Sequence, residues 1–397
     1  MSSSVEVARR SRPRDRKQRI AAAAAVAFAE RGYHQVSMSD VAAAVGISAP
    51  ALYRHYPNKY ALFAEAAFLT AHRLLEDTES FGAEPPADRD AALARLDGLL
   101  DAVIATTIEL RASGGLYRWE GRYLERDDRM RLTAEFSTLR ERLLVPFAVA
   151  RPGLSDDDRG LLVWGALSVV ASITAHRTTL AAAALADLLR DAAWRVLESD
   201  PLPRAPAREP VAGIPAAGRR ERLVTEAIAL FARRGYHDTS IEEIATAVEL
   251  TPSGVYRHFP SKAAILLEAC ERAAERLEDG MGRAREAASA RDAVHLAATD
   301  YVRRSVENQQ LIRVYFADLG SLAVEDQRRL RTLQRAYVAE WAELLGRARP
   351  ELSTREATVL VHAGFGVVAD LLVLPRRGDR DLEAPVTRLL ELVLGAS

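Results

Sequence analysis

Lysine and cysteine are the two residues that this sequence almost lacks. Of 54 basic residues only three are lysine, Lys17, Lys59 and Lys262, and the single cysteine is Cys270. One cysteine excludes a disulfide within the chain and is typical of the reducing cytosol. Because Cys270 lies in an apolar helical pattern without an evident base, we expect a buried thiol rather than a nucleophile.

Net charge and long apolar runs are also missing. The formal charge is -1 over 397 residues, so any binding to nucleic acid must come from local basic patches. The longest apolar stretch, residues 160–175, is shorter than the ~20 residues that a membrane span needs. The N-terminal residues lack the apolar segment of a signal peptide. We therefore expect a cytoplasmic protein of two or more domains.

The motifs of several enzyme classes are absent as well. The sequence contains no G-x-S-x-G, Walker loop, H-E-x-x-H or dinucleotide fingerprint. His34 and His237 have no cysteine or carboxylate partner at ligand spacing, so we expect surface histidines and no metal site. These absences predict that the protein is not an enzyme and needs no cofactor.

What the chain does contain is a repeat as long as a domain. Residues 19–59 align with 222–262 without a gap, and 17 of 41 positions are identical. A second pair, 150–171 and 348–369, shares 10 of 22 positions. The repeat unit is therefore a domain of nearly two hundred residues. Apolar residues at three-to-four-residue spacing predict that both halves are all-helical.

Cap and turn residues divide the first repeated segment into helices. Ser37 and Asp40 form a capping-box-like start for a short helix, and Gly46 supplies a tight turn after it. Ser48 can cap the next helix, which Pro57 ends because the residue before a proline avoids helical geometry. This spacing is that of a helix-turn-helix, whose second helix enters a major groove.

The two lysines outside the N-terminal region occupy the same position in the two copies. Asn58 and Ser261 can cap the helix that follows, which places Lys59 and Lys262 in its first turn. A cation is disfavoured there by the helix dipole, but together with exposed amides it can bind a phosphate. We therefore interpret both lysines as phosphate clamps.

The stretch "RGYHQVSMSDVAAAVGISAPALYRHYPNKYALF" resembles the N-terminal signature of the tetracycline-repressor (TetR) family, and the second copy resembles it too. The resemblance covers about fifty residues of each copy. It implies three N-terminal DNA-binding helices and a helical effector and dimerisation body in each half. The expected fold is all-α, with two tandem TetR-like domains. The expected function is transcriptional regulation, most simply repression, relieved by a small apolar or amphipathic effector.

The resemblance also implies which residues touch an operator of double-stranded DNA. Phosphates would be contacted by Ser37, Tyr53, His55 and Lys59, and in the second copy by Ser240, Tyr256, His258 and Lys262. Base edges would be faced by Ala49, Pro50, Ala51 and Arg54, and by Pro252, Ser253, Gly254 and Arg257. Ser48 and Thr251, at the start of the two recognition helices, complete the set. For Tyr53 and Tyr256, packing in the core is an open alternative.

The second copy departs from the pattern at its turn. Glu249 replaces the glycine found at position 46, and a non-glycine residue at positive φ costs on the order of 1 kcal/mol. We therefore expect the second head to bind DNA less well. Basic residues ahead of each head are expected to contact DNA as well. They are Arg9, Arg10, Arg12, Arg14, Arg16, Lys17 and Arg19 in the first half and, with less charge, Arg204, Arg208, Arg219 and Arg220 in the second.

The expected domains follow the repeat. They are a basic arm (1–14), a first helix-turn-helix domain (15–60), a first effector and dimerisation body (61–198), a proline-rich linker (199–218), a second helix-turn-helix domain (219–263) and a second body (264–397). Family members of ordinary length pair the last two helices of each body between chains. Here residues 155–198 and 353–395 are expected to pair within one chain as a pseudo-dimer, and further homodimerisation stays open.

Aromatic residues of the bodies could line an effector pocket, although aromatic residues at helical spacing usually pack in the core. They are Tyr117, Trp119, Tyr123, Trp164, Tyr301, Tyr315, Phe316 and Phe365. The alternative for the whole chain is a ligand-binding or protein-interaction module of the same fold in which one or both heads are impaired.

Overall fold

All regular structure in the described residues is helical, which confirms the predicted all-α fold. The computed structural model describes residues 13–119, 121–204, 218–373 and 381–396. The first half contains α1 (Pro13–Arg31), α2 (Met38–Ala44), α3 (Ala49–Tyr53), α4 (Lys59–Asp77), α5 (Arg89–Glu109), α6 (Leu116–Trp119), α7 (Arg126–Ala150), α8 (Asp156–Ala171) and α9 (Ala182–Leu197). The second contains α10 (Arg219–Arg234), α11 (Ile241–Ala247), α12 (Pro252–Tyr256), α13 (Lys262–Ala284), α14 (Ala290–Glu307), α15 (Gln309–Asp318), α16 (Val324–Ala348), α17 (Thr354–Val373) and α18 (Glu383–Leu394). Short 3-10 turns are η1 (Glu79–Phe81), η2 (Gly121–Tyr123), η3 (Ser172–Thr174) and η4 (Leu319–Ser321).

The order of helices repeats between the halves. Helices α2 and α11 each have 7 residues, α3 and α12 each have 5, and α7 and α16 each have 25. The repeat seen in the sequence is thus a repeat of structure over each whole half. None of the described helices is long and apolar enough to cross a membrane.

Two compact units make up the chain, and each is described separately. The first comprises Met1–Gly82 with Ala105–Glu141, and the second comprises Ala83–Ile104 with Arg142–Ser397. The first unit therefore holds the helices of the first head and the nearest parts of its body. The second unit holds the entire second half together with α8 and α9.

The first head packs around the apolar face of α1. Ile20, Phe28, Leu52 and Phe63, from α1, α3 and α4, are all at most 1% exposed. The rings of Phe28 and Phe63 meet edge to face, with centroids 5.4 Å apart. Burying such side chains stabilises a fold by roughly 1.5–3 kcal/mol each, so this small core fixes how α3 is presented.

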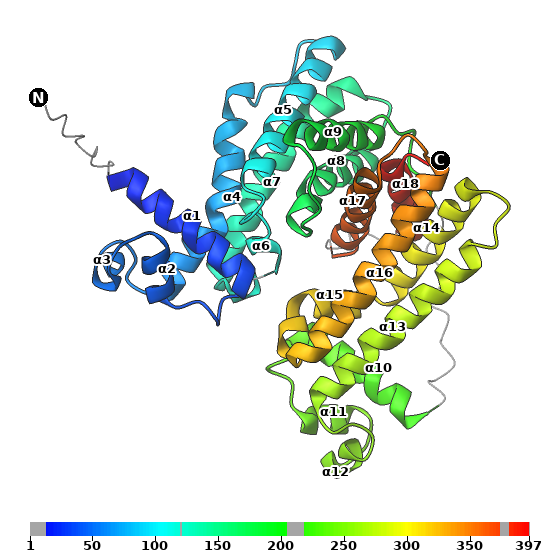
Figure 1. Ribbon diagram of the computed structural model, residues 1–397. Coiled ribbons are helices and arrows are strands. Elements are labelled where there is room, and N and C mark those ends of the chain that lie inside the picture. The colour runs from blue at the N-terminus through cyan, green and yellow to red at the C-terminus, as the bar shows by residue number, and fades with distance from the viewer. Residues whose placement is uncertain (1–12, 120, 205–217, 374–380, 397) are drawn as a thin grey trace, which may run out of the picture. The chain divides into compact units, whose positions relative to one another are not determined.

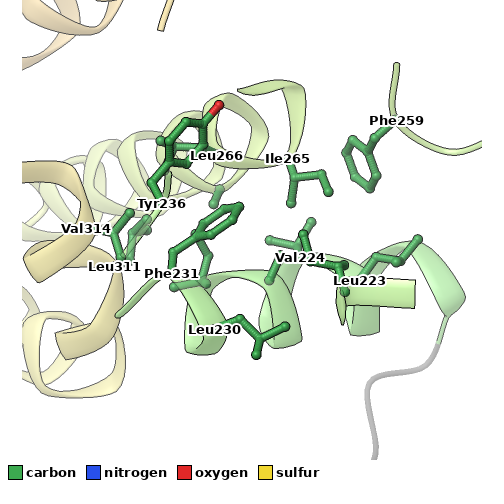
Figure 2. Close-up of a cluster of buried hydrophobic side chains, with 14 of the residues drawn as sticks. Leu223, Val224, Leu230, Phe231, Tyr236, Phe259, Ile265, Leu266, Leu311 and Val314 are labelled. Atoms are coloured by element: carbon green, nitrogen blue, oxygen red, sulfur yellow. The ribbon is translucent and has the colours of Figure 1, made fainter. Parts of the chain in front are cut away.

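The second head has an equivalent core with a contribution from its body. On α10, apolar residues recur at three-to-four-residue spacing, so Leu223, Val224 and Phe231 face α13 on one side of the helix (Figure 2). Leu311 and Val314 of α15 complete the cluster. Because one cluster joins head and body, a shift of α15 would change the packing of α10.

Both heads turn between their second and third helices through a residue in the left-handed conformation. Gly46 has φ +69° and Glu249 has φ +59°, and Glu249 is the one non-glycine residue with positive φ in the described part of the chain. The amide one residue later donates back to the carbonyl five positions earlier, Ile47 to Ala42 (3.0 Å) and Leu250 to Ala245 (2.8 Å). Such a closure demands a left-handed residue, so the strain predicted at Glu249 is present.

Four helices from the two halves pack together inside the second unit. Helices α8 and α9 of the first half lie against α17 and α18 of the second (Figure 1). The approach is closer at Gly366, where an added Cβ would lie 3.3 Å from the Cβ of Ser172, than at Gly165, where an added Cβ would lie 3.6 Å from Leu389, which is an ordinary van der Waals distance. The segments that match between the halves, residues 150–171 and 348–369, thus supply this contact.

Polar contacts reinforce the same packing. Arg195 of α9 donates from Nε to the carbonyl of Leu392 and from a terminal nitrogen to that of Val393, both at 2.9 Å. These carbonyls belong to the last turn of α18, where helical carbonyls lack most of their usual amide partners; the carbonyl of Leu392 also accepts from the amide of Gly395 (3.2 Å). The rings of His176 and His362 stack with centroids 4.3 Å apart. The first half therefore caps the final helix of the second.

Relieving the backbone at Glu249 is expected to stabilise the second head. Glu249→Gly should raise the free energy of unfolding by about 1 kcal/mol, because glycine adopts positive φ without a Cβ clash. Its matched control is Gly46→Ala, where no atom lies within 4 Å of the added Cβ, so that only the backbone cost remains and stability should fall by a similar amount. Thermal unfolding of the full chain measures both. Equal stability of Glu249→Gly and the parent would contradict the strain.

Candidate nucleic-acid interface

Side-chain caps set the start of each helix in the two heads. Ser37 accepts from the Asp40 amide (3.1 Å) while Asp40 accepts from the Ser37 amide (2.8 Å), and Ser240 and Glu243 repeat this capping box. The bonds from Ser37 and, in the second head, from the amide of Ser240 lower the pKa of the Asp40 and Glu243 carboxyls. The capping box predicted at Ser37 and Asp40 is confirmed, and the structure adds the equivalent one at Ser240 and Glu243.

The recognition helices α3 and α12 begin at the predicted caps and end at Tyr53 and Tyr256, three residues before the position that the following proline predicts. The hydroxyls of Ser48 and Thr251 accept from the amides of Ala51 (3.4 Å) and Gly254 (3.2 Å). Each helix then continues into a turn that precedes α4 or α13. The caps at the start of those helices are also confirmed: Asn58 accepts from Ala61 (2.8 Å) and Ser261 from Ala264 (3.2 Å).

Each recognition helix buries one side and exposes the other. Leu52 and Val255 are fully buried, whereas Tyr53 and Tyr256 are 52% and 54% exposed. Core packing of the two tyrosines, the open alternative, is therefore wrong. The predicted DNA-facing residues are exposed or half-buried in both heads; they are Ser37, Ser48, Ala49, Pro50, Ala51, Tyr53, Arg54, His55 and Lys59, and Ser240, Thr251, Pro252, Ser253, Gly254, Tyr256, Arg257, His258 and Lys262.

The two lysines expected to clamp phosphate are engaged with the protein's own backbone. Lys59 donates to the carbonyl of His34 (3.3 Å) and lies 4.6 Å from the ring centre of Tyr33. Lys262 donates to three carbonyls and lies 4.5 Å from the ring centre of Tyr236. Burial lowers the pKa of Lys59. A phosphate contact would require these bonds to be given up.

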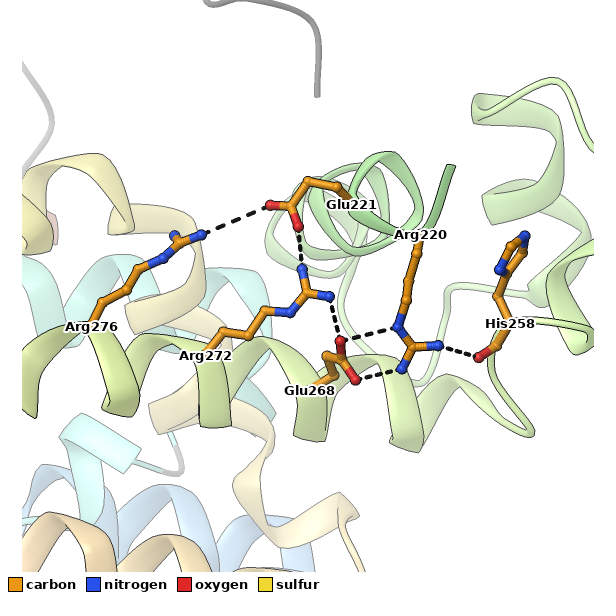
Figure 3. A network of polar contacts seen from close by, with 6 residues as sticks. All are labelled: Arg220, Glu221, His258, Glu268, Arg272 and Arg276. Carbon is orange, nitrogen blue, oxygen red and sulfur yellow. Dashed lines mark hydrogen bonds and ion pairs between the residues drawn. The ribbon is translucent and has the colours of Figure 1, made fainter. Parts of the chain in front are cut away.

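Two of the basic residues that are expected to contact DNA ahead of the heads, Lys17 and Arg220, pair with acids in this structure. Lys17 lies 3.5 Å from Glu65. At the matching place in the second head Arg220 bonds both oxygens of Glu268 (3.1 and 2.6 Å) and the carbonyl of His258 (2.7 Å). Figure 3 shows Glu268 shared with Arg272, which also pairs with Glu221, as does Arg276. This network ties the end of the second recognition helix to α10 and α13.

The other arm residues divide into three groups. Arg16, Arg19 and Arg219 are exposed near their heads. Arg204 binds Ser155 (3.0 Å) and the buried Asp158 (3.4 Å) of α8, so it is held on the body. The remaining arginines lie outside the described part of the chain, either entirely or in their side chains; they are Arg9, Arg10, Arg12, Arg14 and Arg208.

A hollow of about 390 Å³ opens beside the second recognition helix. Glu249, Ser253, Gly254 and Arg257 line it, with Arg219 at the side. A Cβ on Gly254 would lie 3.5 Å from the Cβ of Leu250, which is an ordinary van der Waals distance. In the second head, Glu249 thus places a negative charge in a hollow beside the recognition helix, at the position that Gly46 occupies in the first head.

The aromatic residues expected to line an effector pocket lie in several separate clusters. Tyr301 stacks on Phe365 with centroids 4.3 Å apart, and Tyr337 and Trp341 join them at 4.3–6.4 Å separations within the group. Burial raises the pKa of Tyr301 and Tyr337. Tyr337 and Trp341 were missed by the sequence reasoning, although their four-residue spacing on α16 places them on one face.

The remaining aromatic residues pack elsewhere. Tyr117 lies against Phe136 (4.5 Å), and Tyr315 packs on the core of the second head. Tyr123 stacks on Tyr33 (5.3 Å) and meets the ring of His34 (4.8 Å). Trp164 is half-buried on α8. The side chains of Trp119 and Phe316 lie outside the described residues.

The two histidines expected on the surface are exposed, yet each touches its own body. His34 packs on Tyr123, and Nε2 of His237 lies 3.0 Å from the hydroxyl of Ser321. In the sequence, this contact with the body was indicated only by the tripeptide Gly-Tyr-His, which occurs at the same place in both copies. They mark the joint between head and body.

Comparison with known proteins agrees with this geometry. The family described as bacterial regulatory proteins, tetR family, matches residues 20–66 and again 223–269. Both heads of this chain therefore match the TetR family, each over its helix-turn-helix and the start of the following helix. Both matched segments are described as parts of regulatory proteins, which agrees with the expected DNA-binding role of the two heads.

Individual relatives match over one head only. The chain is 43% identical over 53 residues to the uncharacterised HTH-type transcriptional regulator YerO of Bacillus subtilis (strain 168), which is 13% of this chain and 18% of YerO. It is 46% identical over 48 residues to the HTH-type transcriptional regulator TcmR of Streptomyces glaucescens, 12% of this chain and 21% of TcmR. The chain thus spans about a fifth of the length of these curated relatives.

Solved structures are similar over one half of this chain. A TetR-family transcriptional regulator from Bordetella parapertussis 12822 is 22% identical, with a TM-score of 0.42, over 45% of this chain and 95% of that one. AibR, whose structure contains isovaleryl coenzyme A and operator DNA, is 18% identical, with a TM-score of 0.38, over 45% of this chain and 97% of that one.

The capping boxes of these TetR-family heads should make their stability depend on pH in acid. The folded pKa of Asp40 and of Glu243 is lowered, so the stabilisation is complete above the unfolded values of 3.8 and 4.5. It is lost as pH falls through the lower folded values. Asp40→Ala and Glu243→Ala should lower the thermal midpoint at pH 6 and approach the parent as the solution is acidified. Glu242→Ala, which removes a carboxylate that takes no part in the capping box, is the control. If the thermal midpoints of Asp40→Ala and Glu243→Ala differed from the parent's by the same amount at every pH, as is expected of the control, the capping boxes would not be the source of the pH dependence.

Proposed function

We propose that this protein is a DNA-binding transcriptional regulator, acting as a repressor, that reads one operator with two non-identical heads carried on a single chain. The observation that carries this proposal is the equivalent presentation of α3 and α12. Each helix is capped by a hydroxyl, anchored by one buried aliphatic residue and exposed on its other side. A short helix presented in this way fits a major groove.

Base recognition is assigned to the exposed residues of the two helices. Arg54 and Arg257 can each make the two-bond contact to guanine that arginine prefers. Around them the first head offers Ala49, Pro50 and Ala51, which suit apolar contact with a thymine methyl. The second offers Pro252, Ser253 and Gly254, of which Ser253 can exchange hydrogen bonds with a base.

Phosphate contacts are assigned to side chains at the rim of each helix. Ser37, Tyr53 and His55 serve the first head, and Ser240, Tyr256 and His258 serve the second. Of these, the tyrosines are the most exposed large side chains of their helices. Such contacts hold the register on the duplex without reading its sequence.

Pairing within the chain is supported by the four-helix contact of α8 and α9 with α17 and α18. In a homodimer the corresponding surfaces would come from two chains, whereas here one chain supplies both. Covalent linkage raises the effective concentration of the partner half to roughly the millimolar range for a suitable linker. We therefore assign the heads to the two half-sites of one operator.

Because the heads differ, the operator is proposed to be an imperfect palindrome. Its half-sites would lie about one helical turn apart and share a guanine contacted by the matching arginines. Glu249 adds a negative charge and backbone strain beside α12. We assign the more mismatch-tolerant half-site to this head.

The body of the second half is the proposed site of effector control. Tyr301, Tyr337, Trp341 and Phe365 form a group of aromatic rings on α14, α16 and α17, which suits an apolar or amphipathic molecule. Leu311 and Val314 join this body to the head core. A ligand that moves these helices would change the presentation of α12 and lower DNA affinity.

Selection of bound DNA from a random library, followed by mutation of the two arginines, tests the proposal. Arg54→Ala and Arg257→Ala should each weaken binding to the selected site by about 1–3 kcal/mol and relax sequence preference in one half-site only. Arg347→Ala, on an exposed face of α16, is the control and should bind as the parent does. If the parent enriches no sequence, the chain is instead a ligand-binding module of the same fold with impaired heads.

A further inference from the structure

A lysine at the start of α4 or α13 holds the loop that leads into each helix-turn-helix. In the second head Nζ of Lys262 donates to the carbonyl oxygens of Tyr236 (2.7 Å), His237 (3.2 Å) and Thr239 (2.9 Å). These three residues belong to loop 235–240, which joins α10 to α11. In the first head Lys59 makes one such bond, to His34.

The chemistry of this contact selects lysine over arginine. An ammonium group carries three donors on one compact nitrogen, and loop 235–240 presents three acceptors around it. The tyrosine ring beneath, 4.5 Å from Nζ, adds a cation–π contact. A planar guanidinium is wider and spreads its donors in a fork, so it does not fit three carbonyls that converge on a point.

The same contact accounts for the unusual use of lysine in this chain. Arginine binds phosphate at least as well as lysine does, so a phosphate contact does not explain why two of three lysines among 54 basic residues stand at this position. A set of three converging carbonyl acceptors does explain why lysine stands at this position. With its three donors directed at the loop, Lys262 has none left for DNA in this structure.

Loop 235–240 stands between the body and the reading elements. On one side His237 meets Ser321 of η4 at 3.0 Å. On the other Ser240 caps α11, and Thr239 is buried, donating to the carbonyl of Gly235 (2.8 Å). The lysine thus joins the first turn of α13 to the residues that begin α11.

We propose that Lys262, and more weakly Lys59, is a positioning residue that fixes the loop ahead of the helix-turn-helix and so sets the orientation of the recognition helix. This rests on the proposed DNA-binding function. Its action is through the backbone of the loop, and DNA phosphates are contacted by other groups.

The test compares Lys262→Arg and Lys262→Met in the full chain, with the same two substitutions at Lys59 as the graded comparison. Hydrogen exchange without DNA is measured first. Both Lys262 variants should exchange about tenfold faster than the parent at the amides of loop 235–240 and α11. The Lys59 variants should change less at loop 32–37 and α2, because one bond is lost there instead of three.

DNA binding is measured second, at a temperature where every variant is folded. Lys262→Arg should lower the ratio of specific to non-specific affinity by about tenfold, a quantity that a general loss of stability does not change. Its salt dependence should equal that of the parent, because no phosphate contact has been removed.

Two results would overturn the proposal. One is a Lys262→Arg variant with parental exchange and parental specificity. The other is a Lys262→Met variant with parental exchange that loses specific and non-specific affinity equally, with a salt slope shallower by about 0.9, as expected for one lost phosphate contact. If the parent binds no DNA, the proposed function fails, while the exchange experiment still decides the role of the lysine.

Discussion

Packing of α8 and α9 against α17 and α18 is the contact on which the proposed reading of DNA depends. A helix-turn-helix buries little surface, so a single head binds DNA weakly and must be paired with another to reach a useful affinity. In this chain the surface is assembled from the two copies of the repeat, with a close approach of Gly366 to Ser172 and with Arg195 bonded to the last turn of α18. Loss of this packing would leave two independent heads joined only by the chain between them.

Pairing within one chain removes the constraint that both heads be identical. A homodimer repeats every substitution on both sides, whereas here each head can change alone. The second head shows what this permits: a strained Glu249, an open hollow at Gly254 and an ion network around Glu268 that the first head replaces by one Lys17–Glu65 pair. The first has the glycine turn, and the apolar Pro50 and Ala51. Divergence of this kind suits an asymmetric operator.

Local features of the fold could be predicted from sequence because they depend on neighbouring residues. The caps at Ser37, Ser48 and Asn58 act within three positions of themselves, and the left-handed turn at Glu249 follows from alignment with a glycine. The helical content and the repeat could also be predicted from the sequence.

Contacts over longer distances could not be read in the same way. Nothing in the sequence shows that the acceptors of Lys262 are backbone carbonyls more than twenty positions earlier, since carbonyls are common to every residue. The aromatic residues expected to line a pocket proved to lie in several places, because helical spacing does not tell which neighbour the face of a helix meets. Tyr123 and Tyr315 therefore turned out to support heads, while Tyr337 and Trp341 completed the aromatic group instead.

The central claim, that one chain reads one operator, is tested most directly by the mass of the saturated complex with the shortest duplex that retains full affinity. Native mass spectrometry on the parent protein gives the number of chains per duplex. The account predicts one chain on an imperfect palindrome with two half-sites. Two chains on a perfect palindrome, with no complex of one chain at lower protein concentration, would contradict it.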